Sequence, residues 1–253
     1  MRVAPLGSCV KRAFDVRTHP APPTYRKKDP KIPWQHLDTA QVPGDGDELR
    51  LMRRGTEYSI MTGGIELMNS RLSGSEEALA TLAFERIGAR PKVRVLIGGL
   101  GMGFTLRAAL AAFGADAEIV VAELVPGVIA WARGPLGELY GNSLSDPRTA
   151  LHEGDVGALI NAEEGGWDAI LLDVDNGPGG LSRKENDGLY SASGLTAAKR
   201  ALRPGGVLEV WSSTRDAAFT KRLKQAGYAV EEIGVRAHKG RGARHVIWMA
   251  IRA

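Results

Sequence analysis

The chain has 253 residues, of which 43% are hydrophobic and 25% are charged, a composition that excludes wholesale disorder and a fibrous repeat. The single cysteine, Cys9, excludes an intramolecular disulfide and a cysteine-based zinc cluster, so we expect a reducing, cytoplasmic compartment. No run of about 18 apolar residues occurs, and residues 1–12 lack the apolar stretch of a secretory signal, so we expect neither a membrane span nor export.

The formal net charge is +4, and much of the basic excess lies between Lys11 and Lys31. A solvated basic tail explains such a terminal cluster better than a nucleic-acid footprint does, so no nucleic-acid partner is expected.

The first 46 residues are rich in proline and show no sustained apolar period, which predicts a loosely ordered, basic arm. Residues 47–72 contain three short apolar runs separated by the turn signals Arg54-Gly55 and Gly63-Gly64, which predicts a small β-meander. Residues 75–86 have apolar side chains at helical spacing and the acids Glu76 and Glu77 in the first turn, which predicts a helix.

From residue 93 onward, predicted strands and helices alternate. Strands are expected at residues 93–97, 117–123, 149–152, 167–173, 207–211, 230–236 and 245–251, and helices at 105–113, 126–133, 193–201 and 217–226. Repeated strand-helix units predict an α/β fold for residues 73–253, with a mostly parallel seven-stranded Rossmann-like sheet covered by helices on both faces. Ligands of such sheets bind at the carboxyl ends of the strands.

The first of these strand ends carries the glycines Gly99, Gly101 and Gly103. Glycines between a strand and a helix let the backbone turn tightly and approach a ligand closely, since no Cβ intervenes. The dinucleotide fingerprint places its third glycine where this chain has Phe104, which argues against NAD and an oxidoreductase. A tight turn without a ligand remains the alternative for the glycines alone.

Two acids follow the next predicted strands. Glu123 comes 20 residues after Gly103, where a carboxylate can accept hydrogen bonds from both hydroxyls of a ribose. Asp155 follows the third strand, where its side chain can reach an adenine amino group or simply cap the next helix. Their neighbours Leu124 and Val156 are expected to contact the same nucleoside.

The apolar strand at residues 167–173 ends in Asp173, followed by Asp175 and Asn176. In extended backbone the two aspartates point to the same side, where they would raise one pKa toward the range of a general base or clamp a cationic amine. The alternative is that they cap the strand and build the following turn. Tyr190, Asn176 and Trp211 are candidates for the acceptor wall, although the two aromatic residues equally suit ordinary packing.

The order of these features, a glycine-rich turn, Glu123, Asp155 and Asp173, resembles the class I S-adenosylmethionine-dependent transferases. More narrowly, residues 48–253 are similar to the spermidine synthase-like family, which has a small β-domain before a Rossmann-like domain. The resemblance implies that Glu123 binds ribose, that Asp155 binds adenine and that Asp173 stands beside the transferred group. It also implies S-adenosylmethionine or its decarboxylated form as the donor, no metal, and a homodimer.

The chain departs from the pattern of true aminopropyltransferases in the residues that would choose the reaction. Gly101 stands where these enzymes carry an acid that holds the amine of decarboxylated S-adenosylmethionine, and Asn176 replaces their second acid after the fourth strand. The family's Tyr-His-Glu segment has no clear counterpart near Glu76. We therefore expect methyl transfer to a small acceptor, an amine among the candidates, with Asp173 as base or orienter. Aminopropyl transfer is the first alternative, and a nucleoside-binding module without catalysis is the second.

Overall fold

The computed structural model describes residues 32–44, 46–174, 177–178, 187–238 and 241–253. Most of the predicted arm, together with Asp175 and Asn176, lies outside these residues. No helix in the described part of the chain is long and apolar enough to cross a membrane.

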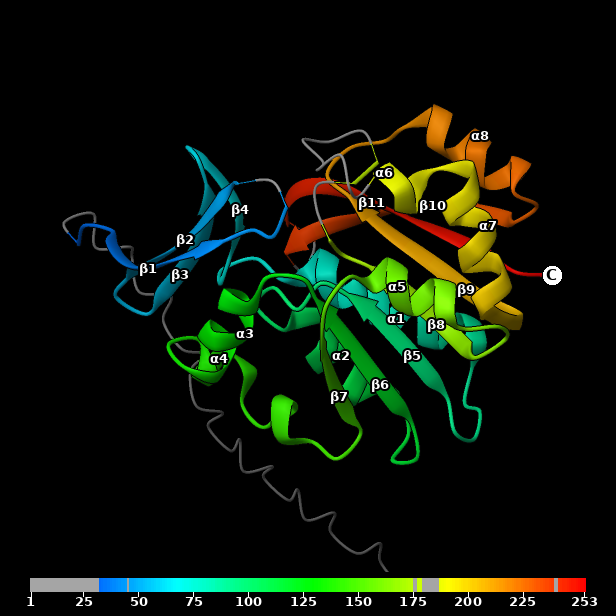
Figure 1. Cartoon of the computed structure of the whole chain (residues 1–253), viewed down its shortest axis with the longest axis horizontal. Coiled ribbons are helices and arrows are strands. Elements are labelled where there is room, and N and C mark those ends of the chain that lie inside the picture. The colour runs from blue at the N-terminus through cyan, green and yellow to red at the C-terminus, as the bar shows by residue number, and fades with distance from the viewer. Residues whose placement is uncertain (1–31, 45, 175–176, 179–186, 239–240) are drawn as a thin grey trace, which may run out of the picture. The chain divides into compact units, whose positions relative to one another are not determined.

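An antiparallel sheet of four strands in the order β1-β2-β3-β4 precedes the larger domain (Figure 1). The strands are β1 (Gln35–Gln41), β2 (Glu48–Arg54), β3 (Glu57–Thr62) and β4 (Ile65–Asn69). Strands β2 to β4 are the predicted meander, whereas β1 lies in the range expected to be an arm. The sequence did not predict β1, because the strand lies within a proline-rich segment. It contains no proline itself, but it buries only Ala40 and therefore shows no apolar period.

The larger sheet has seven strands in the order β10-β11-β9-β8-β5-β6-β7. These are β5 (Arg94–Gly98), β6 (Glu118–Glu123), β7 (Thr149–Glu153), β8 (Trp167–Leu172), β9 (Leu202–Ser212), β10 (Ala229–His238) and β11 (Arg241–Ile251). Strands β5 to β9 pair in parallel, while β11 runs antiparallel to β9 and β10 antiparallel to β11. The predicted Rossmann-like α/β fold, with a mostly parallel seven-stranded sheet behind a small β-sheet, is confirmed.

Helices cover both faces of this sheet (Figure 1). They are α1 (Gly74–Ile87), α2 (Phe104–Ala112), α3 (Pro126–Arg133), α4 (Gly137–Tyr140), α5 (Val156–Ala162), α6 (Asp187–Tyr190), α7 (Ala192–Ala201) and α8 (Ala217–Gln225), with a 3-10 turn η1 (Ser143–Ser145). The short helices α4, α5 and α6 were not expected from the sequence, because four to seven residues do not establish a helical period.

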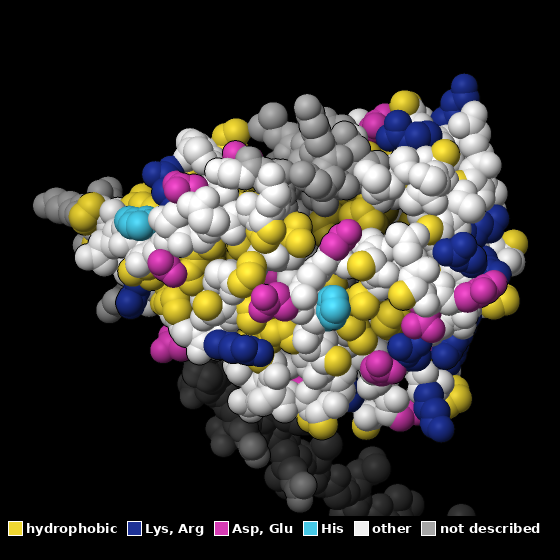
Figure 2. Space-filling view, viewed as in Figure 1, with side chains coloured by type: hydrophobic (Ala, Val, Ile, Leu, Met, Phe, Trp, Pro, Cys, Tyr) yellow, Lys and Arg dark blue, Asp and Glu magenta, His cyan; other side chains and the backbone are white. Residues whose placement is uncertain are grey.

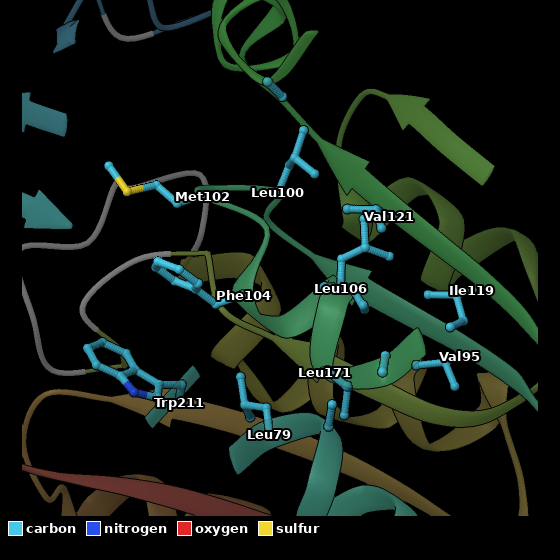
Figure 3. Close-up of a cluster of buried hydrophobic side chains, with 14 of the residues drawn as sticks. Leu79, Val95, Leu100, Met102, Phe104, Leu106, Ile119, Val121, Leu171 and Trp211 are labelled. Atoms are coloured by element: carbon cyan, nitrogen blue, oxygen red, sulfur yellow. The ribbon is translucent and has the colours of Figure 1, made fainter. Parts of the chain in front are cut away.

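The side chains of the central strands alternate between two hydrophobic cores, one on each face of the sheet. In β8, Ala169 and Leu171 enter the core shared with α1 and α2, while Ile170 and Leu172 enter the core shared with α5 and α7. Figure 3 shows Leu79, Leu106 and Leu171 within the first of these cores. Each fully buried leucine contributes about 1.5–3 kcal/mol, so both faces hold the strand ends firmly in register.

The four-stranded sheet shares the first core. Leu51 of β2 and Ile60 of β3 are buried in the same cluster as Val128 of α3. The Trp131 indole of α3 also donates a hydrogen bond to Asp38 Oδ2 of β1 at 2.8 Å. These contacts hold the small sheet against the edge of the larger domain where β5 and β6 end.

Candidate active site

A cavity of about 220 Å³ lies at the carboxyl ends of β5, β6 and β8, with the four-stranded sheet forming its opposite wall. The chain runs from β5 outward to β7 and then returns to β8 on the other side of β5, so the cavity lies where the strand order reverses. Figure 2, viewed as Figure 1, shows hydrophobic side chains gathered over the middle of the molecule, with acidic side chains among them. The predicted site residues that line the cavity are Gly99, Gly101, Glu123, Leu124, Asp155, Val156, Asp173 and Trp211.

The glycine-rich turn after β5 depends on left-handed backbone. Gly99 has a φ of 90° and packs so closely on the carbonyl oxygen of Asp173 that a Cβ there would collide with it. Gly101 has a φ of 51°, and its carbonyl oxygen accepts a hydrogen bond from the Tyr140 hydroxyl at 2.6 Å. Tyr140, on α4, is a support for the turn that sequence reasoning did not find.

Glu123 ends β6 and ties the glycine turn to the next connection. Its Oε2 accepts a hydrogen bond from the backbone N–H of Leu100 at 2.9 Å, and its Oε1 accepts one from the N–H of Val125 at 2.8 Å. Burial raises the pKa of the Glu123 carboxyl, while these backbone donors act in the opposite direction. The side chain also lines the cavity, so a structural and a ligand-binding role are compatible.

Asp155 caps helix α5 and also lines the cavity. Its Oδ1 accepts a hydrogen bond from the backbone N–H of Gly157 at 2.9 Å, which is the helix-capping alternative left open by the sequence. Asp155 is exposed and lines the cavity, so the cap does not bury it.

Asp173 follows directly after β8, and its backbone N–H donates to the carbonyl oxygen of Gly98 at 2.9 Å. The hydroxyl of Thr105, at the start of α2, lies 3.2 Å from Asp173 Oδ2 and 3.2 Å from the carbonyl oxygen of Glu76. Thr105 therefore links the carboxylate at the end of β8 to the first turn of α1.

Glu76 is the most informative cavity residue that sequence reasoning missed. The sequence predicts only that Glu76 is an acid in the first turn of a helix, whereas in the structure it lines the cavity together with Asp173. Burial raises the pKa of the Glu76 carboxyl, and the nearby charge of Glu77 adds to the effect. Apolar residues of the small sheet were also missed; those lining the cavity are Leu49, Ile60, Leu67 and Met68.

Among the candidates that the structure describes, Gly103 and Tyr190 lie outside the cavity lining. Gly103 has a φ of 77° and lies against the Tyr140 ring, so it shapes the turn from behind. Tyr190 is buried in the core, where its ring meets Phe219 edge-on at 5.7 Å between centroids, which is the packing role that the sequence left open. Trp211, by contrast, lines the cavity and meets the His245 ring edge-on at 4.8 Å.

No protein-family model matches the chain. It is 30% identical over 230 residues to a polyamine aminopropyltransferase of Mycobacterium tuberculosis, an alignment that covers 85% of this chain and 40% of the relative. A polyamine aminopropyltransferase of Nitrosomonas europaea is 37% identical over 93 residues, which cover 37% of this chain and 27% of that protein. The chain thus spans less than half the length of these curated relatives.

The crystal structure of spermidine synthase from Thermotoga maritima superposes with a TM-score of 0.67 at 18% identity. The superposition covers 87% of this chain and 73% of that one, and it extends across both sheets, so the two proteins share their fold. The curated sequence relatives and this shared fold agree: the chain resembles the spermidine synthase-like family and has the class I S-adenosylmethionine-dependent fold.

Proposed function

We propose that the chain transfers an aminopropyl group from decarboxylated S-adenosylmethionine to an amine acceptor of the polyamine class. The observation that carries this proposal is the charge of the cavity. Five acids line it, and no lysine or arginine does so among the described residues; the acids are Asp47, Glu76, Glu123, Asp155 and Asp173.

This charge favours the decarboxylated donor over S-adenosylmethionine itself. The decarboxylated molecule carries a sulfonium and an ammonium group, both cationic, which the surrounding carboxylates attract. S-adenosylmethionine carries an additional carboxylate, for which the described lining offers no cationic side chain. The same reasoning applies to the acceptor, because a polyamine is a chain of ammonium groups.

The curated relatives support aminopropyl transfer rather than the methyl transfer that the sequence analysis put first, since both are named polyamine aminopropyltransferase. The missing acid at Gly101 weighed against aminopropyl transfer. In the folded chain Glu76 and Asp173 supply two carboxylates to the same cavity, so an amine-holding acid does not have to come from the glycine turn.

The proposed reaction is a displacement at carbon. The lone pair of the acceptor nitrogen forms a bond to the aminopropyl carbon next to sulfur, the carbon–sulfur bond breaks, and neutral methylthioadenosine leaves with the electron pair. The new C–N bond leaves an extra proton on nitrogen, which must pass to a base. Since the sulfonium is already activated, catalysis consists chiefly of alignment and of removing this proton.

Each part of the cavity has a proposed task. Glu123 receives the ribose hydroxyls and Asp155 the adenine, with Leu124 and Val156 beside them. Asp173, held by the Thr105 hydroxyl, orients the acceptor amine. Trp211 forms an apolar wall that covers the methylene groups of the amine.

Product analysis tests the proposal. The protein is incubated with a diamine or triamine and either donor, and the products are identified by mass spectrometry. The proposal predicts an aminopropylated amine and methylthioadenosine from the decarboxylated donor, and loss of both in Asp173→Asn. Formation of a methylated amine and S-adenosylhomocysteine from S-adenosylmethionine would support the methyltransferase alternative instead. Donor binding with no product from any amine would support the non-catalytic module.

A further inference from the structure

A chain of hydrogen bonds leads out of the cavity from Glu76. The Ser75 hydroxyl donates to Glu76 Oε2 at 2.6 Å, and His245 Nδ1 lies 2.9 Å from the same hydroxyl oxygen. Ser75 and Glu76 open α1, whereas His245 belongs to β11, 170 residues from Ser75. The Ser75 side chain is completely buried, so these bonds form away from solvent.

The far end of this chain reaches a second cavity. His245 is half-buried, and it lines a space of about 520 Å³ between the connection after β9 and the strands β10 and β11. Thr214, Gly234 and Arg236, which line the same space, are exposed, so the cavity opens to solvent. The His245 ring lies edge-on to Trp211, which lines the first cavity. Ser75 and His245 thus connect a residue that lines the first cavity, Glu76, to the lining of the second.

The three groups can exchange a proton without moving their heavy atoms. In one arrangement Glu76 is a carboxylate that accepts from Ser75, and Ser75 accepts from the His245 Nδ1–H. In the other, Glu76 is protonated and donates to Ser75, Ser75 donates to Nδ1, and Nε2 carries the ring proton. Passing from the second arrangement to the first moves one proton from Glu76 to the imidazole, which then releases the proton on Nε2 to solvent.

We propose that Glu76, Ser75 and His245 form a relay that carries the proton lost by the acceptor amine from the reaction cavity to the second cavity. The inference rests on the proposed amine transfer. The nitrogen gives its proton to the Glu76 carboxylate, Glu76 passes one through the Ser75 hydroxyl to Nδ1, and Nε2 releases one to water. Each group receives one proton and gives one up, and exchange of the ring proton with water restores the starting tautomer.

The charged surroundings of both ends suit this transfer. Burial and the nearby charge of Glu77 raise the pKa of Glu76, and burial lowers the pKa of His245. The two values move toward each other, so transfer between the groups requires less free energy than between an exposed glutamate and histidine. The second cavity is lined by the basic residues Arg215, Arg236 and Arg244, whose charges favour departure of the proton from the ring.

The test measures kcat and the donor KM across pH in wild-type protein and in Ser75→Ala, His245→Asn and His245→Ala. The relay predicts that the first two variants lower kcat about 10-fold to 100-fold, with a changed pH profile and an unchanged donor KM. Added imidazole restores part of the kcat of His245→Ala, because the second cavity admits it. His238→Gln, an exposed histidine on β10, is the matched control and leaves kcat unchanged.

The relay is overturned if His245→Asn keeps kcat within twofold of wild type with a superposable pH profile, or if imidazole has no effect on His245→Ala. Nitrogen NMR of the His245 ring distinguishes failure of the relay from failure of the proposed amine transfer. If no amine is turned over at all, amine transfer fails, and the relay is then judged by Glu76→Gln. A shift in the His245 tautomer or pKa in that variant supports the hydrogen-bonded relay, and unchanged resonances overturn it.

Discussion

Met68 occupies the space in front of Gly101: a Cβ on Gly101 would come within 2.7 Å of the methionine Cε. Through this contact β4 places an apolar side chain where an acid at position 101 would project. Gly101→Asp is expected to lower the free energy of unfolding by about 1–3 kcal/mol, chiefly through the left-handed φ of 51°, with a smaller part from displacing the flexible end of Met68.

The double variant with Met68→Ala separates these two causes. Removing the methionine relieves the collision and leaves the backbone cost, so the loss from Gly101→Asp is expected to be smaller in the Met68→Ala background. Denaturant unfolding of the four proteins gives the coupling free energy. Equal losses in the two backgrounds would show that Met68 is not the obstacle.

Glu76→Gln tests whether this carboxylate holds an amine. We expect affinity for a diamine acceptor to fall about 10-fold to 100-fold, as for loss of a charged hydrogen-bond partner, while methylthioadenosine, which has no amine, binds as before. Because burial raises the pKa of Glu76, wild-type affinity for the acceptor should weaken as pH falls through that raised value. Calorimetry checks both, with Glu77→Gln as the control, and equal losses for the two ligands would contradict the assignment.

Glu123→Gln should affect the glycine turn and the nucleoside together. An amide can accept only one of the two backbone hydrogen bonds, and its NH2 group would face the other N–H. We expect a loss of about 1–3 kcal/mol in unfolding free energy and weaker binding of methylthioadenosine. Glu153→Gln, at the exposed end of the neighbouring strand β7, should change neither quantity. Wild-type stability in Glu123→Gln would show that these bonds contribute little.

The buried Glu209, on β9, should make the free energy of unfolding depend on pH. The side chain is buried, neither carboxyl oxygen has a hydrogen-bond partner among the described residues, and burial raises its pKa well above the usual value. Above the pKa of the unfolded chain, the folded chain keeps a proton that the unfolded chain has lost. Stability therefore falls by up to about 1.4 kcal/mol per pH unit until the folded pKa is reached.

Glu209→Gln removes this titration, so its stability relative to wild type should increase as pH rises from 5 to 8. Glu209→Met, which also removes the buried polar group, should be more stable than wild type across the range. Denaturant unfolding at several pH values measures the differences. A difference between Glu209→Gln and wild type that stays constant with pH would contradict a buried, protonated Glu209.

The Rossmann-like core was predictable because its strands and helices have clear apolar periods and its glycine turn stands between them. The strand β1 was not, since nearly all of its side chains are exposed and its pairing with β2 provides the order. Glu123, Asp155 and Asp173 could be predicted to lie together because each is at or just after the end of a strand of the parallel sheet. Strand ends gather at one edge, so position along the chain predicts position in space.

Residues that reach the site from other elements carry no such signal. Glu76 comes from the first turn of a helix, where acids commonly serve the helix dipole, and Met68 comes from the separate small sheet. His245 joins Ser75 across 170 residues, and only the antiparallel pairing of β11 with β9 brings it there. Tyr190 shows the opposite case, since an aromatic residue near the expected acceptor wall packs on Phe219.

Separate titrations with the two donors test the central claim most directly. Wild-type protein is titrated by calorimetry with decarboxylated S-adenosylmethionine and, separately, with S-adenosylmethionine, under the same buffer and salt. A cavity whose described lining carries five acids and no lysine or arginine predicts at least about tenfold tighter binding of the decarboxylated donor. Equal or tighter binding of S-adenosylmethionine would contradict the account.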